Sequence, residues 1–410
     1  MLPASALQAA SSVPVPLEFV LFGATLVALA IFQHHTLRVA LIGLFAITSY
    51  KLAVTGFKEA PGLSGLIAHL QHEWVMLANL LFLLTAFALL ARHFEKSQVP
   101  SALPRFMPRD WKAGFVLLLI VWVLSIFLDN IAAALIGGAM ASQLFRGKVH
   151  VGFLAAITAA ANAGGAWSVV GDTTTTMMWV AGVSPAAVFE AIVAAGISLL
   201  VFGFPAAKRQ HAYSPMVAHV HEPTPIDWAR VLIVILMLVS AIAANAGLNV
   251  WRPDLAERFP FIGAAVWLAL LLTVPLRRPD WEFVPRTVRG SIFLLALVLA
   301  ASMMPVEKLP PPSWQTTLGL GFVSAVFNNI PLTALALKQG GYDWGLLAYA
   351  VGFGGSMIWF GSSAGVALCT LFPEARSVAR WVRDGWWVAV AYLLGFFAML
   401  AVWPWHPAPR

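Results

Sequence analysis

One stretch decides the fold: NAGGAWSVVGDTTTT, residues 162–176, whose pattern returns later as VGFGGSMIWFGSS, residues 351–363. Each stretch contains Gly-Gly, five further residues and then Gly. A second shared motif precedes each of them, FLDNIAAALIG (127–137) in the first half and VFNNIPLTALA (326–336) in the second. Polar, glycine-rich motifs that repeat in two halves of an apolar chain are typical of transporters built on an internal repeat.

The composition indicates an integral membrane protein. Of 410 residues, 60% are hydrophobic and only 10% are charged, and the mean hydropathy is +0.82. Soluble domains carry roughly 25% charged residues, so the expected surroundings are a lipid bilayer. The net charge of +7 indicates retained cytoplasmic loops rather than a nucleic-acid partner. The single Cys369 excludes an internal disulfide, and residues 1–16 lack the Lys or Arg of a cleaved signal peptide.

Apolar runs predict ten full crossings. These are 17–33, 37–55, 74–91, 151–181, 186–204, 228–247, 260–276, 288–304, 342–371 and 386–403. Two further segments, 111–146 and 314–339, reach a polar tip and then turn into a second arm of about ten to fifteen residues. An ordinary pair of spans is the simpler interpretation, but such short arms favour re-entrant hairpins.

The basic residues test this map. If both hairpins return to the side where they start, 18 of the 25 Lys and Arg lie on one side of the membrane. The other side receives Lys51, Lys58, Arg252, Arg258, Lys308, Lys338 and Arg410. By the positive-inside rule the richer side is cytoplasmic and both termini face outward. The expected location is the inner (plasma) membrane of a bacterium.

Five crossings per half is an odd number, so the second half is expected to be inverted relative to the first. The predicted fold is an all-α polytopic membrane protein with two inverted-topology repeats, 1–204 and 228–410, joined by a cytoplasmic connector, 205–227. Each repeat contains a re-entrant hairpin and a broken helix, 151–181 or 342–371. The hairpin tips then converge near the midplane, which is the arrangement of alternating-access carriers.

Two acidic residues fall inside the membrane, Asp129 at the first hairpin tip and Asp172 inside the crossing 151–181. An ionised side chain at the bilayer centre costs roughly 2.5–3.5 kcal/mol, so such residues are usually functional. Each also precedes a helical run and could simply cap it. The two interpretations are compatible, because a broken helix presents free backbone groups at a binding site.

Glycines surround both predicted breaks. They are Gly164, Gly165 and Gly171 in the first half, and Gly354, Gly355 and Gly361 in the second. Close helix packing through small residues is one explanation. Because the same spacing occurs twice, each time beside hydroxyl residues such as Thr173 and Ser362, the favoured explanation is an unwound segment whose carbonyls face an ion.

The polar groups near these motifs form a ligand set for hard cations. Carboxylate, amide, hydroxyl and carbonyl oxygens are the ligands of such ions, so Asp129 and Asp172 are expected to hold a hard cation. Asn130, Asn162 and Asn329 can complete the shell or satisfy freed backbone groups. Imidazole groups lie mostly in loops; the connector residues His211, His219 and His221 are a weaker alternative metal site. Glu190, five residues into its span, is expected to lie at the membrane interface.

At these residues the chain resembles the NhaD-type sodium/proton antiporters, a branch of the ion-transporter superfamily that includes citrate and dicarboxylate carriers. NAGGAWSVVGDTTTTMMW, FLDNIAAALI and GGSMIWFGSSAGVAL carry the resemblance, which covers about 111–181 and 314–371. It implies two hairpins, broken helices and ion sites at the hairpin tips. It implicates Asp129, Asn130, Gly165, Asp172, Thr173, Asn329, Gly355 and Ser362.

The chain departs from this family at two positions. Asn328 stands where the family usually has Asp, and Val169 stands where it usually has Pro. Without an acid at position 328, neither the family's transport stoichiometry nor the identity of its ion carries over directly to this chain.

The leading hypothesis is exchange of Na⁺ or Li⁺ for H⁺ at one site used in alternation, with no cofactor and no enzymatic activity. The alternative is a cation-coupled citrate or dicarboxylate symporter, although two fixed carboxylates repel a polyanion and no Lys or Arg lies near the tips. An intramembrane aspartyl protease needs Gly-x-Gly-Asp, which Val169 breaks. The sequence leaves a homodimer open.

Overall fold

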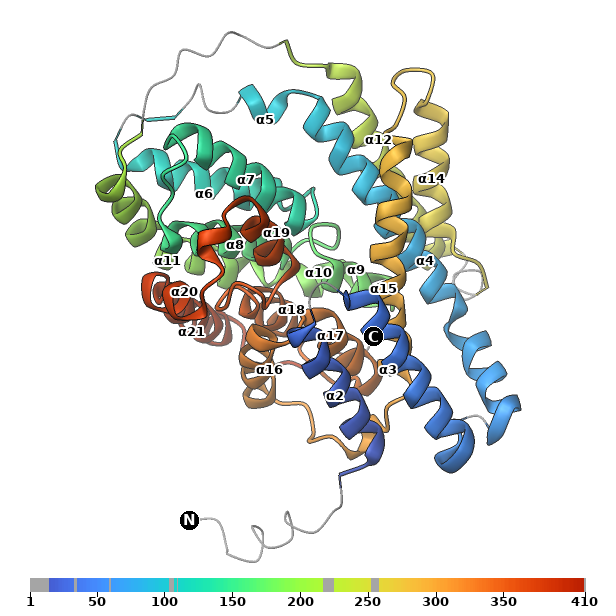
Figure 1. Cartoon of the computed structure of the whole chain (residues 1–410). Coiled ribbons are helices and arrows are strands. Elements are labelled where there is room, and N and C mark those ends of the chain that lie inside the picture. The colour runs from blue at the N-terminus through green and yellow to red at the C-terminus, as the bar shows by residue number, and fades with distance from the viewer. Residues whose placement is uncertain are drawn as a thin grey trace, which may run out of the picture.

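The structure, a computed structural model, describes residues 15–32, 35–58, 60–102, 107–108, 110–216, 225–251 and 258–408. Every regular element within these ranges is helical (Figure 1). The fold is therefore all-α, as predicted. Several residues used in the sequence interpretation lie outside the described ranges: Arg105, Arg109, His219, His221, Arg252 and Arg410.

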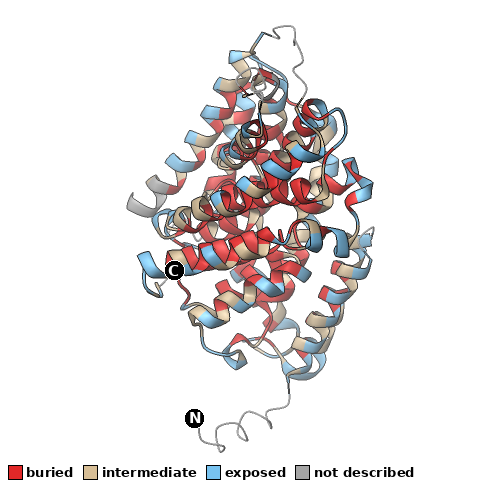
Figure 2. Cartoon of the chain, turned by 90° about the vertical axis from the view of Figure 1, so that its left-hand side faces the viewer, coloured by how far each residue is buried: buried red, intermediate tan, exposed pale blue. Residues whose placement is uncertain are grey.

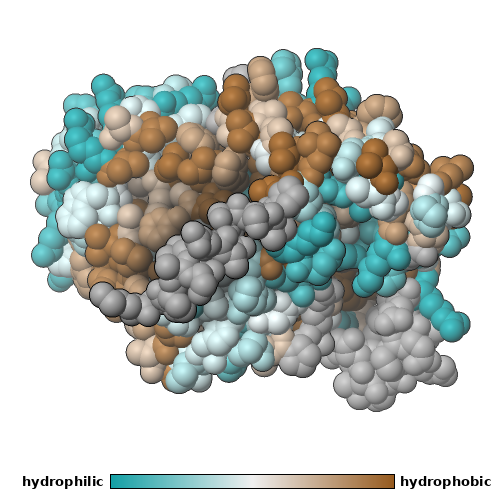
Figure 3. Space-filling view, turned by 90° about the horizontal axis from the view of Figure 1, so that it is seen from below, coloured by the Kyte–Doolittle hydropathy of each residue, from teal (hydrophilic) through white to brown (hydrophobic). Residues whose placement is uncertain are grey.

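Six helices form one bundle, which we call the frame. They are α2 (Leu17–Ile31), α3 (Thr36–Tyr50), α4 (Gly62–Lys96), α12 (Trp228–Trp251), α14 (Phe261–Thr273) and α15 (Val284–Ser302). Helix α4 packs against α12, α14 and α15, and α3 packs against α2 and α15. Large apolar side chains such as Phe45, Ile242 and Leu272 are exposed on these helices, as a lipid-facing surface requires. Figure 3 shows such apolar side chains interspersed with polar ones on the lower face.

The other helices form a second bundle, which we call the core bundle. It contains α6 (Lys112–Leu124), α7 (Asn130–Leu144), α8 (Val151–Gly165), α9 (Thr173–Val180), α10 (Pro185–Phe189), α11 (Ile192–Tyr213), α16 (Trp314–Val326), α17 (Asn329–Gln339), α18 (Trp344–Gly354), α19 (Ser363–Leu371), α20 (Val378–Asp384) and α21 (Trp387–Val402). Short elements complete the fold: η2 (Lys51–Thr55), α5 (Val99–Ala102), η4 (Trp281–Phe283), η5 (Val306–Lys308) and η6 (Pro373–Ala375).

Helices α8 and α18 run through the middle of the core bundle. Their sequences, VGFLAAITAAANAGG and WGLLAYAVGFG, are apolar or small on every face, and nearly every residue in them is buried. A helix of this kind is stable only when other helices surround it. Figure 2 shows the buried residues gathered at the centre of this side of the molecule.

Among the residues that the structure describes, five helical segments are long and apolar enough to cross a membrane. They are Thr36–Thr55, Gly62–Lys96, Pro185–Tyr213, Trp228–Asn245 and Trp281–Ser302. A sixth arises if α20 and α21, bent by 61° at a short break, are one span. Several apolar helices of 10–17 residues, among them α6, α7, α8 and α18, accompany them. The chain is therefore a polytopic membrane protein. The short helices α6, α7, α8 and α18 belong to the predicted hairpins and broken crossings, whereas α2 and α14 are also of this shorter class although 17–33 and 260–276 were predicted as full crossings.

Two element boundaries differ from expectation. The predicted crossing 74–91 is the apolar part of α4, which begins at Gly62. Polar residues such as Gln71 and Glu73 lower the hydropathy of that first part without interrupting the helix. Similarly, α11 continues through Pro205 to Tyr213, so the predicted connector 205–227 starts as helix, and its residues 217–224 lie outside the described ranges.

Candidate ion-binding site

Each predicted hairpin tip is a break between two helices, capped by its polar residue. Helix α6 ends at Leu124 and α7 begins at Asn130, where Asp129 Oδ1 accepts a hydrogen bond from the Ile131 backbone N–H at 2.7 Å. In the second half, α17 begins at Asn329, and Asn328 Oδ1 accepts from the Ile330 N–H at 3.0 Å. The amide therefore replaces the carboxylate without loss of the cap.

Both predicted broken helices are interrupted at their glycine segments. Helix α8 ends at Gly165 and α9 begins at Thr173. Asp172 caps α9, since its Oδ1 accepts from the Thr174 N–H at 2.8 Å. In the second half α18 ends at Gly354, and Ser362 Oγ caps α19 by accepting from the Gly365 N–H at 3.2 Å.

The glycines serve close approach rather than unusual backbone angles. None of the six has a positive φ. A Cβ added at Gly164 would lie 2.1 Å from the Trp122 carbonyl oxygen, and one at Gly354 would lie 2.2 Å from the Gly321 carbonyl oxygen. Each broken helix thus lies directly against the first arm of its hairpin. Close packing, the less favoured explanation from the sequence, therefore applies at Gly164 and Gly354, while an unwound segment whose carbonyls face an ion stays a prediction.

A hydrogen-bonded network joins the two halves at the first break. Asn130 Nδ2 donates to Asp172 Oδ2 at 2.9 Å and to Asn162 Oδ1 at 3.1 Å. Asn162 Nδ2 in turn donates to Ser356 Oγ at 2.9 Å. Thr174 donates a further bond to Asp172 through its hydroxyl, at 2.9 Å. Asp172 is 1% exposed, so these donors compensate a deeply buried carboxylate.

Asp129 is held differently. It is half-buried, and within the described residues the one hydrogen bond to its carboxyl group comes from the Ile131 N–H. The rest of the carboxyl group remains available to a ligand. The two aspartates therefore offer one accessible carboxyl group and one fixed carboxyl group at neighbouring helix N-termini.

Five of the six polar residues predicted to bind the cation or proton line one cavity of about 850 Å³ between the frame and the core bundle. At one end lie Asp129, Asn130, Asp172, Thr173 and Asn329. The cavity extends to residues on the basic side of the molecule, namely Arg92, Glu95, Gln143 and Arg286. The sixth polar residue, Ser362, lines a smaller cavity of about 290 Å³ together with Asn328. The six predicted glycines are not among the lining residues of either cavity.

Ion pairs surround the basic end of the larger cavity. Lys96 Nζ lies 2.9 Å from Asp280 Oδ2, and Arg92 Nη2 lies 3.2 Å from the same oxygen. The hydrogen bond from Lys96 is the largest reason that the pKa of Asp280 lies below its ordinary value. This carboxylate keeps the two cations at the rim, away from Asp129 and Asp172.

Sequence reasoning missed three serines that support the site. Ser125 Oγ donates to the Ala161 carbonyl oxygen at 2.6 Å, and Ser324 Oγ donates to the Val351 carbonyl oxygen at 2.7 Å. Each lies four residues before its tip residue, Asp129 or Asn328, so the repeat itself was a usable signal. Ser356 had no such signal, because its first-half counterpart is Ala166.

These features define a polytopic membrane protein in which two carboxylates at helix breaks face an intramembrane cavity. No family model matches the chain. Sodium/proton antiporter 1 of Arabidopsis thaliana is 25% identical to it, over 84% of this chain and 65% of that protein, so the chain spans just under two thirds of that relative. Na⁺/H⁺ antiporter NhaD of Alkalimonas amylolytica is 27% identical, over 82% of this chain and 79% of that protein.

The corresponding protein of Vibrio parahaemolyticus, also a Na⁺/H⁺ antiporter NhaD, is 27% identical over 73% of this chain and 84% of its own length. The similarity extends well beyond the two motif regions. The resemblance to NhaD-type antiporters that the motifs predicted is therefore confirmed.

Proposed function

We propose that this protein exchanges Na⁺ or Li⁺ for H⁺ by alternating access, and that Asp129 and Asp172 form the shared cation and proton site. The relatives carry the name of this activity. The observation that carries the proposal for this chain is that both carboxylates line one cavity with Asn130, Thr173 and Asn329. An oxygen-rich set of this kind suits a small hard cation.

The helix ends support the same assignment. Asp129 and Asp172 cap the N-termini of α7 and α9, so the helix dipoles favour the ionised carboxylates. Either a metal cation or a proton then balances the charge. Because the same oxygens serve both, arrival of Na⁺ displaces the proton and arrival of a proton displaces Na⁺, which couples the two fluxes.

Access to the site from one side at a time follows from how the two bundles meet. Within the described residues they contact each other where α15 packs on α17 and α4 packs on α9. On the basic side the large cavity separates them. We assign that side to the cytoplasm by its positive charge, so the conformation corresponds to an inward-open state. Movement of the core bundle against the frame would close this cavity and open one outside.

The proposal includes the expectations that the two halves are inverted repeats, that 205–227 connects them, and that both termini lie outside a bacterial inner membrane. Matching local geometry at the tips and breaks supports the repeat. Neither a cofactor nor an enzymatic step is needed.

The test uses everted vesicles and a fluorescent reporter of the pH gradient. The parent protein should dissipate the gradient when Na⁺ or Li⁺ is added, without any organic acid. Asp172→Asn should abolish this response while the protein remains in the membrane, because the amide keeps an oxygen for the α9 cap. Asp110→Asn, at an exposed loop carboxylate, is the matched control and should respond normally. An unchanged response in both Asp172→Asn and Asp129→Asn would overturn the proposal.

One observation favours the alternative, symport of a citrate-type carboxylate. The cavity is much larger than an ion, and Arg286 lines its rim. Its deep end carries the two carboxylates and, within the described residues, no basic group. Proton-coupled uptake of citrate without a response to Na⁺ alone would establish this alternative instead.

A further inference from the structure

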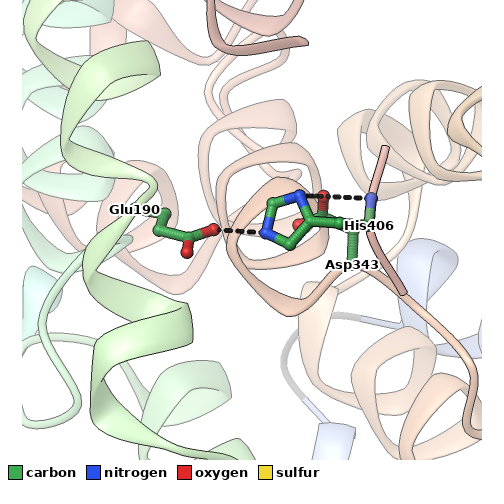
Figure 4. A group of neighbouring side chains, drawn as sticks. All are labelled: Glu190, Asp343 and His406. Atoms are coloured by element: carbon green, nitrogen blue, oxygen red, sulfur yellow. Dashed lines mark hydrogen bonds and ion pairs between the residues drawn. The ribbon is translucent and has the colours of Figure 1, made fainter. Parts of the chain in front are cut away.

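A second polar cluster lies away from the cavity, where three separate segments meet. Glu190 follows α10, Asp343 caps α18, and His406 lies in the segment after α21. Figure 4 shows the imidazole ring between the two carboxylates. His406 Nε2 lies 2.9 Å from Glu190 Oε2, and His406 Nδ1 lies 3.2 Å from Asp343 Oδ2.

The surroundings of His406 Nδ1 fix which ring nitrogen carries hydrogen. Nδ1 lies 2.8 Å from the Pro404 carbonyl oxygen, which can only accept a hydrogen bond. Asp343 Oδ2 is a second acceptor on the same side of the ring. Asp343 is itself 2% exposed and held by the Leu346 N–H, which donates to its Oδ1 at 3.0 Å. Nδ1 is therefore the donor, and the neutral ring presents a lone pair at Nε2.

That lone pair faces another acceptor. Glu190 Oε2 and His406 Nε2 are 2.9 Å apart, and two acceptors at this distance need a positive charge between them. That charge can be a proton on Nε2 or a metal ion. A metal ion would fit a common arrangement, in which a carboxylate orients a histidine whose second nitrogen binds the metal.

The segment that carries His406 is held in place independently. The Ala408 N–H donates to the Tyr342 carbonyl oxygen at 3.1 Å, and Trp344 Nε1 donates to the Ala408 carbonyl oxygen at 2.9 Å. The His406 side chain is 46% exposed and that of Glu190 is 27% exposed. The cluster is thus preformed and partly exposed.

We propose that Glu190, Asp343 and His406 form a site for a divalent transition metal of the zinc class. The His406 Nε2 and the Glu190 carboxylate are the ligands, Asp343 orients the ring, and water completes the coordination. Imidazole with carboxylate suits Zn²⁺ and Co²⁺ rather than Mg²⁺ or Na⁺, so this site is distinct from the transported ion's site. A bound metal would tie the end of α10 to the segment after α21, which Asp343 links in turn to the start of α18.

The test titrates the purified, untagged full chain with Zn²⁺ in a calorimeter and with Co²⁺ in a spectrophotometer. The parent should bind one equivalent of Zn²⁺ and should show a Co²⁺ absorption band. His406→Gln and Glu190→Gln should lose both the Zn²⁺ binding and the band. Asp343→Asn should bind about 10–100-fold more weakly. His72→Gln, at an exposed histidine on α4, is the control and should bind like the parent.

Stability gives a second readout. Zn²⁺, but not Mg²⁺, should raise the Tm of the parent, because an ion that binds only the folded state stabilises it. His406→Gln should show no such shift. The proposal would be overturned if the parent bound no Zn²⁺, or if His406→Gln and Glu190→Gln bound it as the parent does. A proton shared by His406 Nε2 and Glu190 Oε2 would then explain their short distance.

Discussion

Asp129 and Asp172 differ in how much of each carboxyl group is already used. Asp172 accepts three hydrogen bonds and is 1% exposed, whereas Asp129 accepts one and is half-buried beside the cavity. We therefore assign the exchange of ligands with water mainly to Asp129. Asp172 supplies a fixed charge whose position depends on Asn130.

This difference predicts selective chemical modification. Dicyclohexylcarbodiimide reacts with protonated carboxyl groups that it can reach, so it should label Asp129 and leave Asp172 unmodified. Because Na⁺ competes for the same oxygens, added Na⁺ should reduce the labelling. Peptide mass spectrometry of the protein in membranes measures both effects. Label on Asp172, or labelling that Na⁺ does not alter, would contradict the assignment.

Asn328 offers a second test at this scale. Asn328→Asp should be well tolerated, because the carboxylate oxygen can accept the same bond from the Ile330 N–H. The added charge faces the smaller cavity beside Ser362 and should change the number of cations bound per cycle. The measurement is the dependence of Na⁺-driven proton flux on an imposed membrane potential.

Asn328→Ala is the matched control for that experiment. It removes the cap, at a cost of about 1 kcal/mol, but adds no charge. If Asn328→Asp and the parent respond identically to membrane potential, the asymmetry between the halves does not set the stoichiometry.

At the scale of elements, the contact between each broken helix and its hairpin arm is made by backbone atoms. Gly164→Ala and Gly354→Ala would each place a methyl group against a carbonyl oxygen about two ångströms away. Backbone on both sides leaves little room for relief, so each change should cost at least about 1–3 kcal/mol. A fall in Tm in detergent and a loss of monodisperse protein measure the effect.

Gly319 provides the comparison, because it lies on α16 and nothing lies within 4 Å of a Cβ added there. Gly319→Ala should leave Tm unchanged or slightly raised, since alanine favours a helix. Equal effects at Gly164 and Gly319 would show that close approach is not what the repeated glycines provide.

Local features of the site were predictable from the sequence because they depend on neighbouring residues. Asp129 and Asp172 each cap the helix that follows them, and a polar residue before a helical run is a local signal. The breaks at the two Gly-Gly segments were predictable for the same reason. The beginning of α4 was not, since hydropathy measures lipid compatibility and not helix formation.

Contacts between the halves could not be predicted. Asn162 pairs with Ser356 across 194 residues of chain, and nothing near either residue indicates the other. Likewise, Glu190 was expected at the interface, and only the fold brings His406 to it. The identity of the ligand at such places depends on non-local geometry.

At the scale of the whole molecule, an ion pair joins the two bundles on the side opposite the cavity's basic rim. Glu73 Oε1 on α4 lies 3.6 Å from Lys338 Nζ at the end of α17. The Glu73 side chain is 9% exposed. Because the proposed alternating access requires the frame and the core bundle to separate here, we expect this pair to favour the conformation that is closed on this side.

Breaking the pair should both destabilise the protein and alter its cycle. Lys338→Met leaves a buried carboxylate without its partner, which costs about 1–3 kcal/mol, while the double swap Glu73→Lys with Lys338→Glu should recover most of the loss. Thermal unfolding and Na⁺-driven proton flux provide the two measurements. Glu307→Gln, on a 3₁₀ turn, is the control. Failure of the swap to recover either quantity would contradict a direct interaction.

The length of α4 has a consequence for the surrounding lipid. At 35 residues and 1.5 Å per residue it measures about 52 Å, while the hydrocarbon layer of a typical bilayer is about 30 Å thick. The helix must tilt or project, and any change of tilt is passed to α9, which it contacts. Acyl-chain length in reconstituted liposomes should therefore set the exchange rate, with an optimum at one thickness and slower turnover in thinner or thicker membranes.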